Sequence, residues 1–323
     1  MNVAPSMTES NAPPVRGKHG GYERLVNASR ALPPIAMGVV HPCSVEALEA
    51  ALAGRAEGLI EPILVGPESR IRAIAASAGL DLAGITIEST EHSHASAEKA
   101  VELARHGRVG ALMKGSLHTD ELLHAVLDKE NGLRTERRLS HVFAIDVPAY
   151  PRPLLITDAA ININPDLMAK RDIVQNAIDL ACRIGIFEPR VAILSAIETI
   201  NPALRSTLDA AALCKMAERG QIVGGRLDGP LAFDNATSVE AARIKNIHSD
   251  VAGCADILVV PDLEAGNMLV KQLTLFADAD SAGIVLGARV PIVLTSRSDS
   301  VRNRIASIAL GVLLAHSRTA VAP

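Results

Sequence analysis

Three side chains suited to anion chemistry stand close together in the segment LTSRSDS. Ser296 offers a hydroxyl donor, Arg297 a planar guanidinium that can bind two oxygens of a phosphate or carboxylate, and Asp299 a carboxylate. The segment follows the apolar run 291–295 and precedes apolar residues at helical spacing. A helix that starts directly after a strand presents free backbone N–H groups and a positive dipole end, both of which favour an anion. The alternative, in which Ser298 or Asp299 only caps the helix, leaves Arg297 unexplained.

A second strand exit carries a cation, in the segment ALMKGSLHTDELL (residues 111–123). Lys114 follows an apolar run, Gly115 permits a tight turn, and a helix is expected from Thr119 or Asp120. Lys114 is a candidate anion contact, with a solvated surface lysine as the alternative. The segment is not a P-loop, because the pattern GxxxxGK[ST] is absent.

Polar side chains also follow other predicted strands, among them the strand at 152–160. Asp158 and Asn162 lie between a strand and a helix that we expect to be capped near Asp166, which favours a polar cleft over turn chemistry alone. Other strand exits carry carboxylates and Gly266-Asn267, where glycine lets a backbone approach a ligand. None of these carboxylates has a distinctive metal-ligand spacing, so no metal site is predicted. They are Asp228, Asp234, Asp262 and Glu264.

The elements that must position these residues alternate along the chain. Strand-like runs alternate with amphipathic helical patterns, which predicts a mostly parallel sheet flanked by helices. The alternation breaks at residues 133–160, where Pro148, Pro151 and Pro153 mark a turn or a domain crossing. We expect strands at 35–40, 62–65, 85–88, 109–113, 138–147, 152–160, 191–195, 222–223, 257–260, 283–286 and 291–295. We expect helices at 45–52, 68–77, 96–105, 119–127, 167–183, 204–218, 238–247, 263–278 and 300–314.

Composition excludes several classes of function. A net charge of −4 argues against a broad nucleic-acid surface, and 2% aromatic residues provide few stacking platforms. The four cysteines form no CxxC pair, which is typical of free thiols in a reducing compartment. No apolar run reaches the roughly 18 residues that span a membrane, and the N-terminus lacks a secretory h-region. We therefore expect a cytoplasmic protein with a disordered tail at residues 1–21.

These segments together resemble the phosphate acetyltransferase / phosphate butyryltransferase family. The matching segments cover roughly residues 110–310, and PDLEAGNM with TSRSDS are the most specific of them. The chain looks most like the acetyltransferase module that follows an enoyl-CoA hydratase domain in some bacterial proteins, although no hydratase-like half is present in this sequence. The other matching segments are ALMKGSLHTDELL, RRLSHVFAIDVP, ITDAAININPDLMAKRDIVQNAI and DGPLAFDNA.

The resemblance implies an architecture. It is an α/β fold of two αβα domains with mostly parallel sheets and a cleft between them, as in isocitrate and isopropylmalate dehydrogenases. Residues 22–146 with 290–323 would form a discontinuous first domain, and residues 147–289 an inserted second domain. Members of the family are generally homodimers.

The resemblance also implies a reaction, acetyl-CoA + phosphate = acetyl phosphate + CoA, by direct attack in a ternary complex. Arg297 would orient the phosphate and Ser296 would donate to the developing oxyanion. Acetyl-specific members carry an aspartate where this chain has Asn303, whereas this chain offers Asp299, as the butyryltransferase-like branch does. Either Asp299 replaces that aspartate as the base, or the reaction needs no side-chain base. No metal or permanently bound cofactor is implied, and CoA is a substrate. The residues expected to bind CoA or phosphate are Lys114, Gly115, Ser140, Asp158, Asn162 and Asn267.

Three alternatives remain open. The first is a phosphate butyryltransferase with longer acyl chains, since chain length is not readable from the sequence. The second is a non-catalytic module that binds acyl-CoA and regulates. The third, a dehydrogenase on the related architecture, is disfavoured because its metal-binding carboxylates and nicotinamide signature are not evident.

Overall fold

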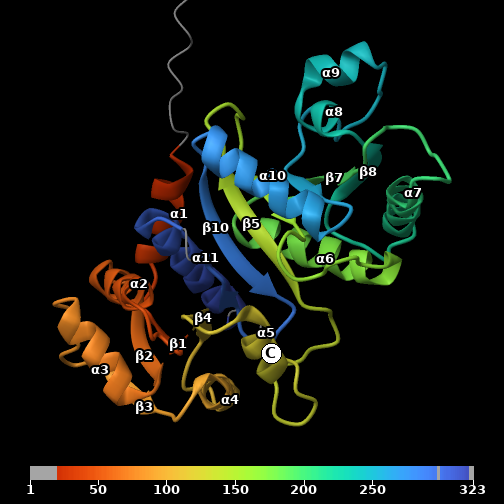
Figure 1. Ribbon diagram of the computed structural model, residues 1–323. Helices are drawn as coiled ribbons and strands as arrows, with labels where there is room; N and C mark the ends of the chain where they lie inside the picture. Colours follow the sequence, from red (N-terminus) through yellow and green to blue (C-terminus); the bar gives the residue numbers. More distant parts are fainter. Residues whose placement is uncertain (1–19, 297–298, 320–323) are drawn as a thin grey trace, which may run out of the picture.

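A computed structural model describes residues 20–296 and 299–319 of the chain, and within them eleven strands form one sheet (Figure 1). The strands are β1 (Ile35–Val40), β2 (Ile60–Gly66), β3 (Thr86–Ser89), β4 (Ala111–Lys114), β5 (Ser140–Asp146), β6 (Leu154–Thr157), β7 (Arg190–Leu194), β8 (Arg226–Leu231), β9 (Ile257–Val259), β10 (Asp280–Leu286) and β11 (Ile292–Val293). The helices are α1 (Gly21–Arg30), α2 (Val45–Ala56), α3 (Glu68–Ser77), α4 (Ser93–Arg105), α5 (Thr119–Val126), α6 (Leu167–Arg183), α7 (Arg205–Glu218), α8 (Phe233–Thr237), α9 (Val239–Ile244), α10 (Leu263–Phe276) and α11 (Val301–Thr319). The α/β class and the mostly parallel sheet are therefore confirmed.

The strand order places the polar strand exits together. The order is β3-β2-β1-β4-β11-β10-β5-β6-β9-β7-β8, and only the pairs that involve β10 or β5 are antiparallel. β4 and β11 are parallel neighbours, with Met113 opposite Val293. Because parallel strands end at the same edge of a sheet, Lys114 and the segment that carries Ser296 leave the sheet side by side.

The two faces of the central strands carry different helices. Ala282, Ile284 and Leu286 of β10 share a core cluster with buried residues of α11. On the opposite face, Ile145 of β5 shares a cluster with Val270 of α10. In Figure 1, α10 crosses in front of β5 and β10. α11 and α10 therefore pack against the same central strands, each from its own face of the sheet.

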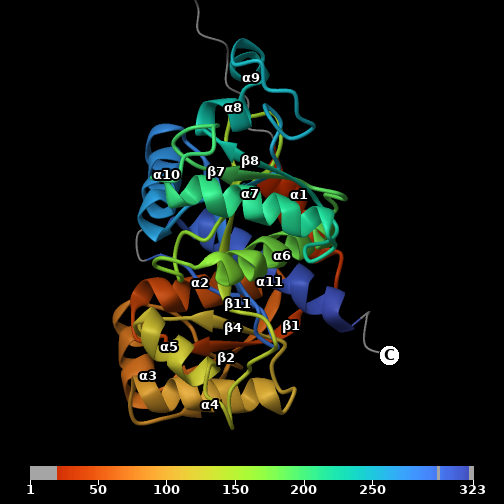
Figure 2. The same ribbon diagram turned by 90° about the vertical axis from the view of Figure 1, so that its right-hand side faces the viewer.

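β10 and β5 stand between two groups of parallel strands, which Figure 2 shows one above the other. Strands β3, β2, β1, β4 and β11 lie on one side, and β6, β9, β7 and β8 on the other. We propose that these groups correspond to the two expected domains, residues 22–146 with 290–323 and residues 147–289. None of the described helices is both long and apolar enough to cross a membrane.

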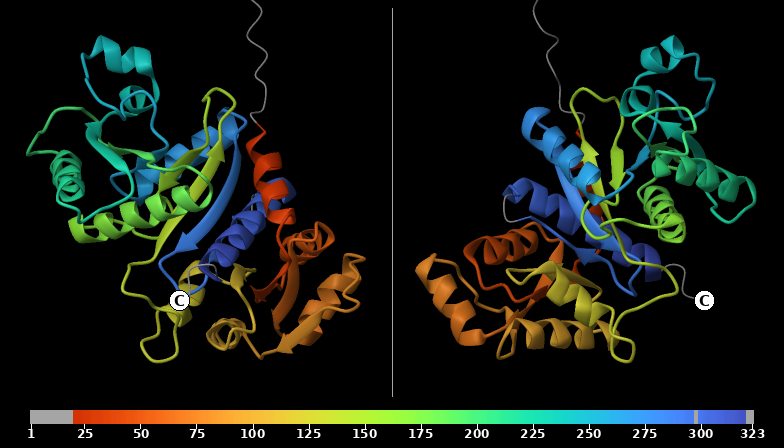
Figure 3. Two further views of the ribbon diagram at one scale, coloured as in Figure 1. Left: turned by 180° about the vertical axis from the view of Figure 1, so that it is seen from behind. Right: turned by 45° about the vertical axis from the view of Figure 1, so that its right-hand side comes forward.

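Helix α1 was not predicted, and it begins at Gly21, inside the expected tail; residues 1–19 of that tail lie outside the described residues. Its buried Ser29 donates from Oγ to the carbonyl of Ala309 on α11 at 2.8 Å. Seen from behind in Figure 3, α1 lies beside α11. The short helix is stabilised by this long-range packing, which local sequence does not reveal.

The strand expected at 222–223 was wrong, because a side chain takes the place of a strand partner. Gln175 on α6 accepts from the Val223 N–H at 2.9 Å and donates to its carbonyl at 2.9 Å. Gly220 and Gly224 have positive φ on either side, which is incompatible with extended pairing. The edge strand β8 begins only at Arg226.

Candidate active site

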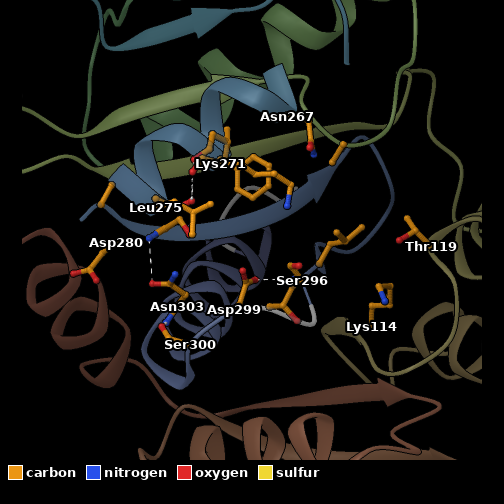
Figure 4. Close-up of a pocket in the computed structure, with 18 of the residues that line it drawn as sticks. Lys114, Thr119, Asn267, Lys271, Leu275, Asp280, Ser296, Asp299, Ser300 and Asn303 are labelled. Atoms are coloured by element: carbon orange, nitrogen blue, oxygen red, sulfur yellow. Dashed lines mark hydrogen bonds between the residues drawn. The ribbon is translucent and has the colours of Figure 1, made fainter. Parts of the chain in front are cut away.

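A cavity of about 690 Å³ opens where β4, β11, α10 and the start of α11 converge (Figure 4). Its lining includes Lys114 and Ser296 from the two neighbouring strand exits, Asp299 before α11, and Asn267 and Lys271 from α10. The structure thus brings together side chains that lie far apart in the sequence. The mixture of cations, a carboxylate, amide and hydroxyl groups suits a phosphate-bearing substrate.

Two hydrogen bonds join Ser296, after β11, to Asp299, before α11. The backbone N–H of Ser296 donates to Asp299 Oδ2 at 2.7 Å, and the N–H of Asp299 donates to the Ser296 carbonyl at 3.2 Å. The first contact is drawn in Figure 4. The bond to Asp299 thus uses the backbone N–H of Ser296.

Ser300, and not Asp299, has the contacts of a helix cap, and Ser298 lies outside the described residues. The Ser300 Oγ accepts from the Asn303 N–H at 3.1 Å, and its carbonyl accepts from the Arg304 N–H. This is the hydrogen-bond pattern of an N-cap residue. The Asp299 carboxylate is therefore available for a role other than capping α11.

The environment of Asp299 alters its acidity. Burial raises the pKa of the Asp299 carboxyl above its ordinary value, and the Ser296 N–H, Arg304 and Lys271 offset part of this shift. A carboxyl group with a raised pKa holds a proton more readily than an exposed aspartate, which suits a group that takes and returns a proton.

Lys114 lines the cavity, and the neighbouring Gly115, although outside the lining, shapes the turn that carries it. The Lys114 ammonium donates to the carbonyls of Gly115 and Leu117 at 3.2 and 3.0 Å, which orients it along the turn. Gly115 is required because a Cβ there would clash with the carbonyl oxygens of Val40 and His41. The turn is thus pressed against the end of β1, and its lysine lines the cavity as predicted.

Helix α10 supplies two residues to the cavity. The helix begins after Asp262, which caps it by accepting from the Ala265 N–H at 2.9 Å. Asn267 donates to the Ala159 carbonyl at 3.3 Å and lines the cavity, as predicted. Lys271 was missed; it stands four residues after Asn267, so helical spacing predicts that both share one face.

Three residues that we expected to contact a ligand are buried and form hydrogen bonds within the protein. Asp158 accepts from the backbone N–H groups of Ala160 and Ile161 at 3.0 Å each, so it fixes the loop that follows β6. Asn162 is also buried, where it donates to Asp158 Oδ2 at 2.6 Å and to the Leu139 carbonyl at 2.9 Å. Ser140 is fully buried and accepts from Asn176 at 2.9 Å. None of the three is part of the cavity lining, although their loops border it.

Arg297, the residue expected to orient phosphate, lies outside the described residues. Two of the remaining carboxylates have local partners. Asp228 was expected at a strand exit but lies within β8, where it accepts from the Gly229 N–H at 2.8 Å, and Asp234 pairs with Lys245 at 3.4 Å. These contacts give no geometric support to a metal site shared by the two carboxylates.

We predict that chelation by EDTA leaves turnover unchanged. Within residues 20–296 and 299–319, no three His, Cys, Asp or Glu side chains are arranged to hold a metal ion. The measurement is the initial rate before and after dialysis against EDTA. A loss of rate that Mg²⁺ restores contradicts the prediction.

Comparisons with known proteins show the family of the chain. Residues 95–312 match the family described as phosphate acetyl/butaryl transferase. A phosphate acetyltransferase from Rhizobium meliloti is 63% identical over 93% of this chain and 95% of its own length. A phosphate butyryltransferase from Clostridium acetobutylicum is 44% identical over 84% of this chain and 90% of its own. A branched-chain phosphotransacylase from Enterococcus faecalis V583 has a similar structure, with a TM-score of 0.77 at 32% identity, over 87% of this chain and 99% of that one. The chain belongs to the phosphate acetyl/butaryl transferase family.

Proposed function

We propose that the protein transfers an acetyl group between coenzyme A and inorganic phosphate. The observation that carries the proposal is the cavity that joins Ser296, Asp299, Lys114 and Lys271 in a member of this family. Acetyl-CoA and phosphate are the substrates, and no permanently bound cofactor takes part. The relative from Rhizobium meliloti, which is 63% identical, is a phosphate acetyltransferase, and this favours acetyl over longer acyl chains.

The chemistry is direct attack of a phosphate oxygen on the thioester carbon. The C–O bond forms as the carbonyl becomes an oxyanion, and the C–S bond then breaks to release CoA. Because no covalent enzyme intermediate is needed, catalysis rests on holding both substrates in near-attack geometry. Ser296 donates to the oxyanion, and Asp299 gives a proton to the leaving thiolate or removes it from the thiol in reverse.

Phosphate is held by cations around the cavity. Lys114 and Lys271 line it from opposite sides, and Arg297 is proposed as the third, on sequence grounds. Arginine supplies a planar fork that fixes orientation, whereas the lysines supply point charges.

We expect Lys271→Gln to raise the phosphate KM about tenfold, because a charge-assisted contact is replaced by a neutral one. Lys215→Gln is the matched control, since Lys215 is exposed on α7, where it pairs with Glu218. Initial rates over a phosphate titration measure both. Equal phosphate KM values in the two variants would remove Lys271 from the phosphate site.

The decisive test of the function is a thiol-release assay with acetyl-, propionyl- and butyryl-CoA, with and without phosphate. We expect phosphate-dependent release, fastest with acetyl-CoA. Fastest release with butyryl-CoA would favour the phosphate butyryltransferase alternative. Binding of acyl-CoA with no release would favour the non-catalytic regulatory module.

We also propose a homodimer that works in the cytoplasm. Exposed apolar side chains on α10, Met268 and Phe276, are suited to a contact with a second copy. All four cysteines are free, as expected in a reducing compartment. Light scattering of the purified protein measures the oligomeric state, and a monomeric mass contradicts the dimer.

A further inference from the structure

Phe143 differs from the other phenylalanines of this aromatic-poor chain. The sequence contains four of them, and Phe187, Phe233 and Phe276 are 80%, 42% and 85% exposed. Phe143, on β5, is partly buried in the core cluster of α10 and lines the active-site cavity. A bulky ring at this place restricts the space inside the cavity.

Strand pairing places Phe143 on the floor of the cavity. It stands opposite Gly283 on β10, and the Gly283 carbonyl accepts from the N–H of Leu294. Leu294 also lines the cavity and precedes Ser296 by two residues. Phe143 and Leu294 are both neighbours of Gly283, so the phenylalanine and the exit of β11 lie close together in the sheet.

The His141 side chain packs against the Phe143 ring. The two rings lie 4.3 Å apart between centroids with an interplanar angle of 60°, and His141 is fully buried. A Cβ at Gly283 would lie 2.6 Å from the Leu294 oxygen and 3.0 Å from His141 Nε2, so this space is already occupied. The His141 ring therefore packs beside the phenyl ring on the same face of β5 and restricts its position.

Other apolar side chains line the cavity as well. Val270 of α10 belongs to the core cluster against which Phe143 packs, and both line the cavity together with Leu294. An acyl chain longer than acetyl must leave the water and occupy an apolar region next to the carbonyl carbon.

We propose that Phe143 sets the length of the acyl chain, by occupying the space that the distal carbons of a butyryl or branched acyl group require. This inference rests on the proposed acyl transfer and names its specificity-determining residue. The ring leaves room for acetyl and excludes longer chains through steric overlap with their third and fourth carbons.

The test compares Phe143→Ala and Phe143→Leu with Phe187→Ala, which removes the same atoms from an exposed site outside the cavity. For each protein, kcat/KM is measured with acetyl-, propionyl-, butyryl- and isobutyryl-CoA at saturating phosphate. Phe143→Ala raises the butyryl-to-acetyl ratio about tenfold, because two more methylenes are buried. Phe143→Leu raises it less, and Phe187→Ala leaves it at the wild-type value.

An unchanged ratio in Phe143→Ala overturns the inference, and if that variant does not fold, an unchanged ratio in Phe143→Leu does so. Dissociation constants for acetyl- and butyryl-CoA, measured without phosphate, give the same ratio independently of turnover. A wild-type protein that releases no CoA with phosphate refutes the proposed function alone, and the binding ratios then still decide the role of Phe143.

Discussion

We expect Asp299→Asn to lower kcat about a hundredfold with little change in either KM, because proton transfer by a positioned side chain contributes roughly 10²–10⁴-fold. Asparagine retains an oxygen that can accept from the Ser296 N–H, so the loop at the β11 exit is preserved. The substitution therefore removes the acid/base function while keeping the hydrogen bond. Steady-state rates in both directions of the reaction measure the effect.

The pH profile provides a second measurement of the same role. Burial raises the pKa of Asp299, and the reverse reaction needs its ionised form to take the thiol proton. The rate with acetyl phosphate and CoA should thus fall as pH drops through this raised pKa, at a midpoint above the ordinary aspartate value of 3.8. In Asp299→Asn this acid limb disappears, since asparagine does not titrate.

The Asp299→Asn substitution should preserve or raise the stability of the fold while it lowers activity. A carboxyl whose pKa is raised on folding stabilises the folded state most at low pH, and that contribution is lost as pH rises through the folded pKa. Asp299→Asn should therefore melt at or above the wild-type temperature at neutral pH. Asp299→Ala separates the two roles, because it also loses the bond to Ser296. If Asp299→Asn keeps full activity and Asp299→Ala does not, the role of Asp299 is structural and it does not act as an acid or base.

The position of the site could be predicted because it depends on topology. Lys114 ends β4, Ser296 lies shortly after β11, and Asn267 lies in the first turns of α10, and such ends gather at one edge of a parallel sheet. Strand exits can be recognised from short apolar runs followed by polar residues. That rule needs no knowledge of side-chain direction.

The use of each polar side chain could not be predicted in the same way. Asp158, Asn162 and Ser140 have the residue types of ligand contacts, yet the structure uses them to satisfy buried backbone and amide groups. The difference depends on which way a side chain points from its loop, which spacing does not reveal. Strand periodicity likewise places Phe143 on the face of His141 without showing that this face borders the cavity.

Ser296→Ala should lower kcat about 10²–10³-fold while both KM values stay close to wild type. The hydroxyl donates to an oxyanion that exists only when charge develops on the carbonyl oxygen, so it stabilises the transition state and not the bound substrates. The backbone N–H that binds Asp299 remains in the variant, and the loop geometry is therefore retained. Rates over a matrix of acetyl-CoA and phosphate concentrations separate kcat from the two KM values.

Two further substitutions make this test specific. Ser296→Thr keeps the hydroxyl and should recover part of kcat, which a purely structural role of the small serine side chain does not predict. Ser300→Ala removes the N-cap of α11 and should lower the free energy of unfolding by about 1 kcal/mol, with kcat largely kept. If the loss in Ser296→Ala appears in the phosphate KM instead, the hydroxyl binds phosphate in the ground state and the oxyanion must be stabilised by another donor.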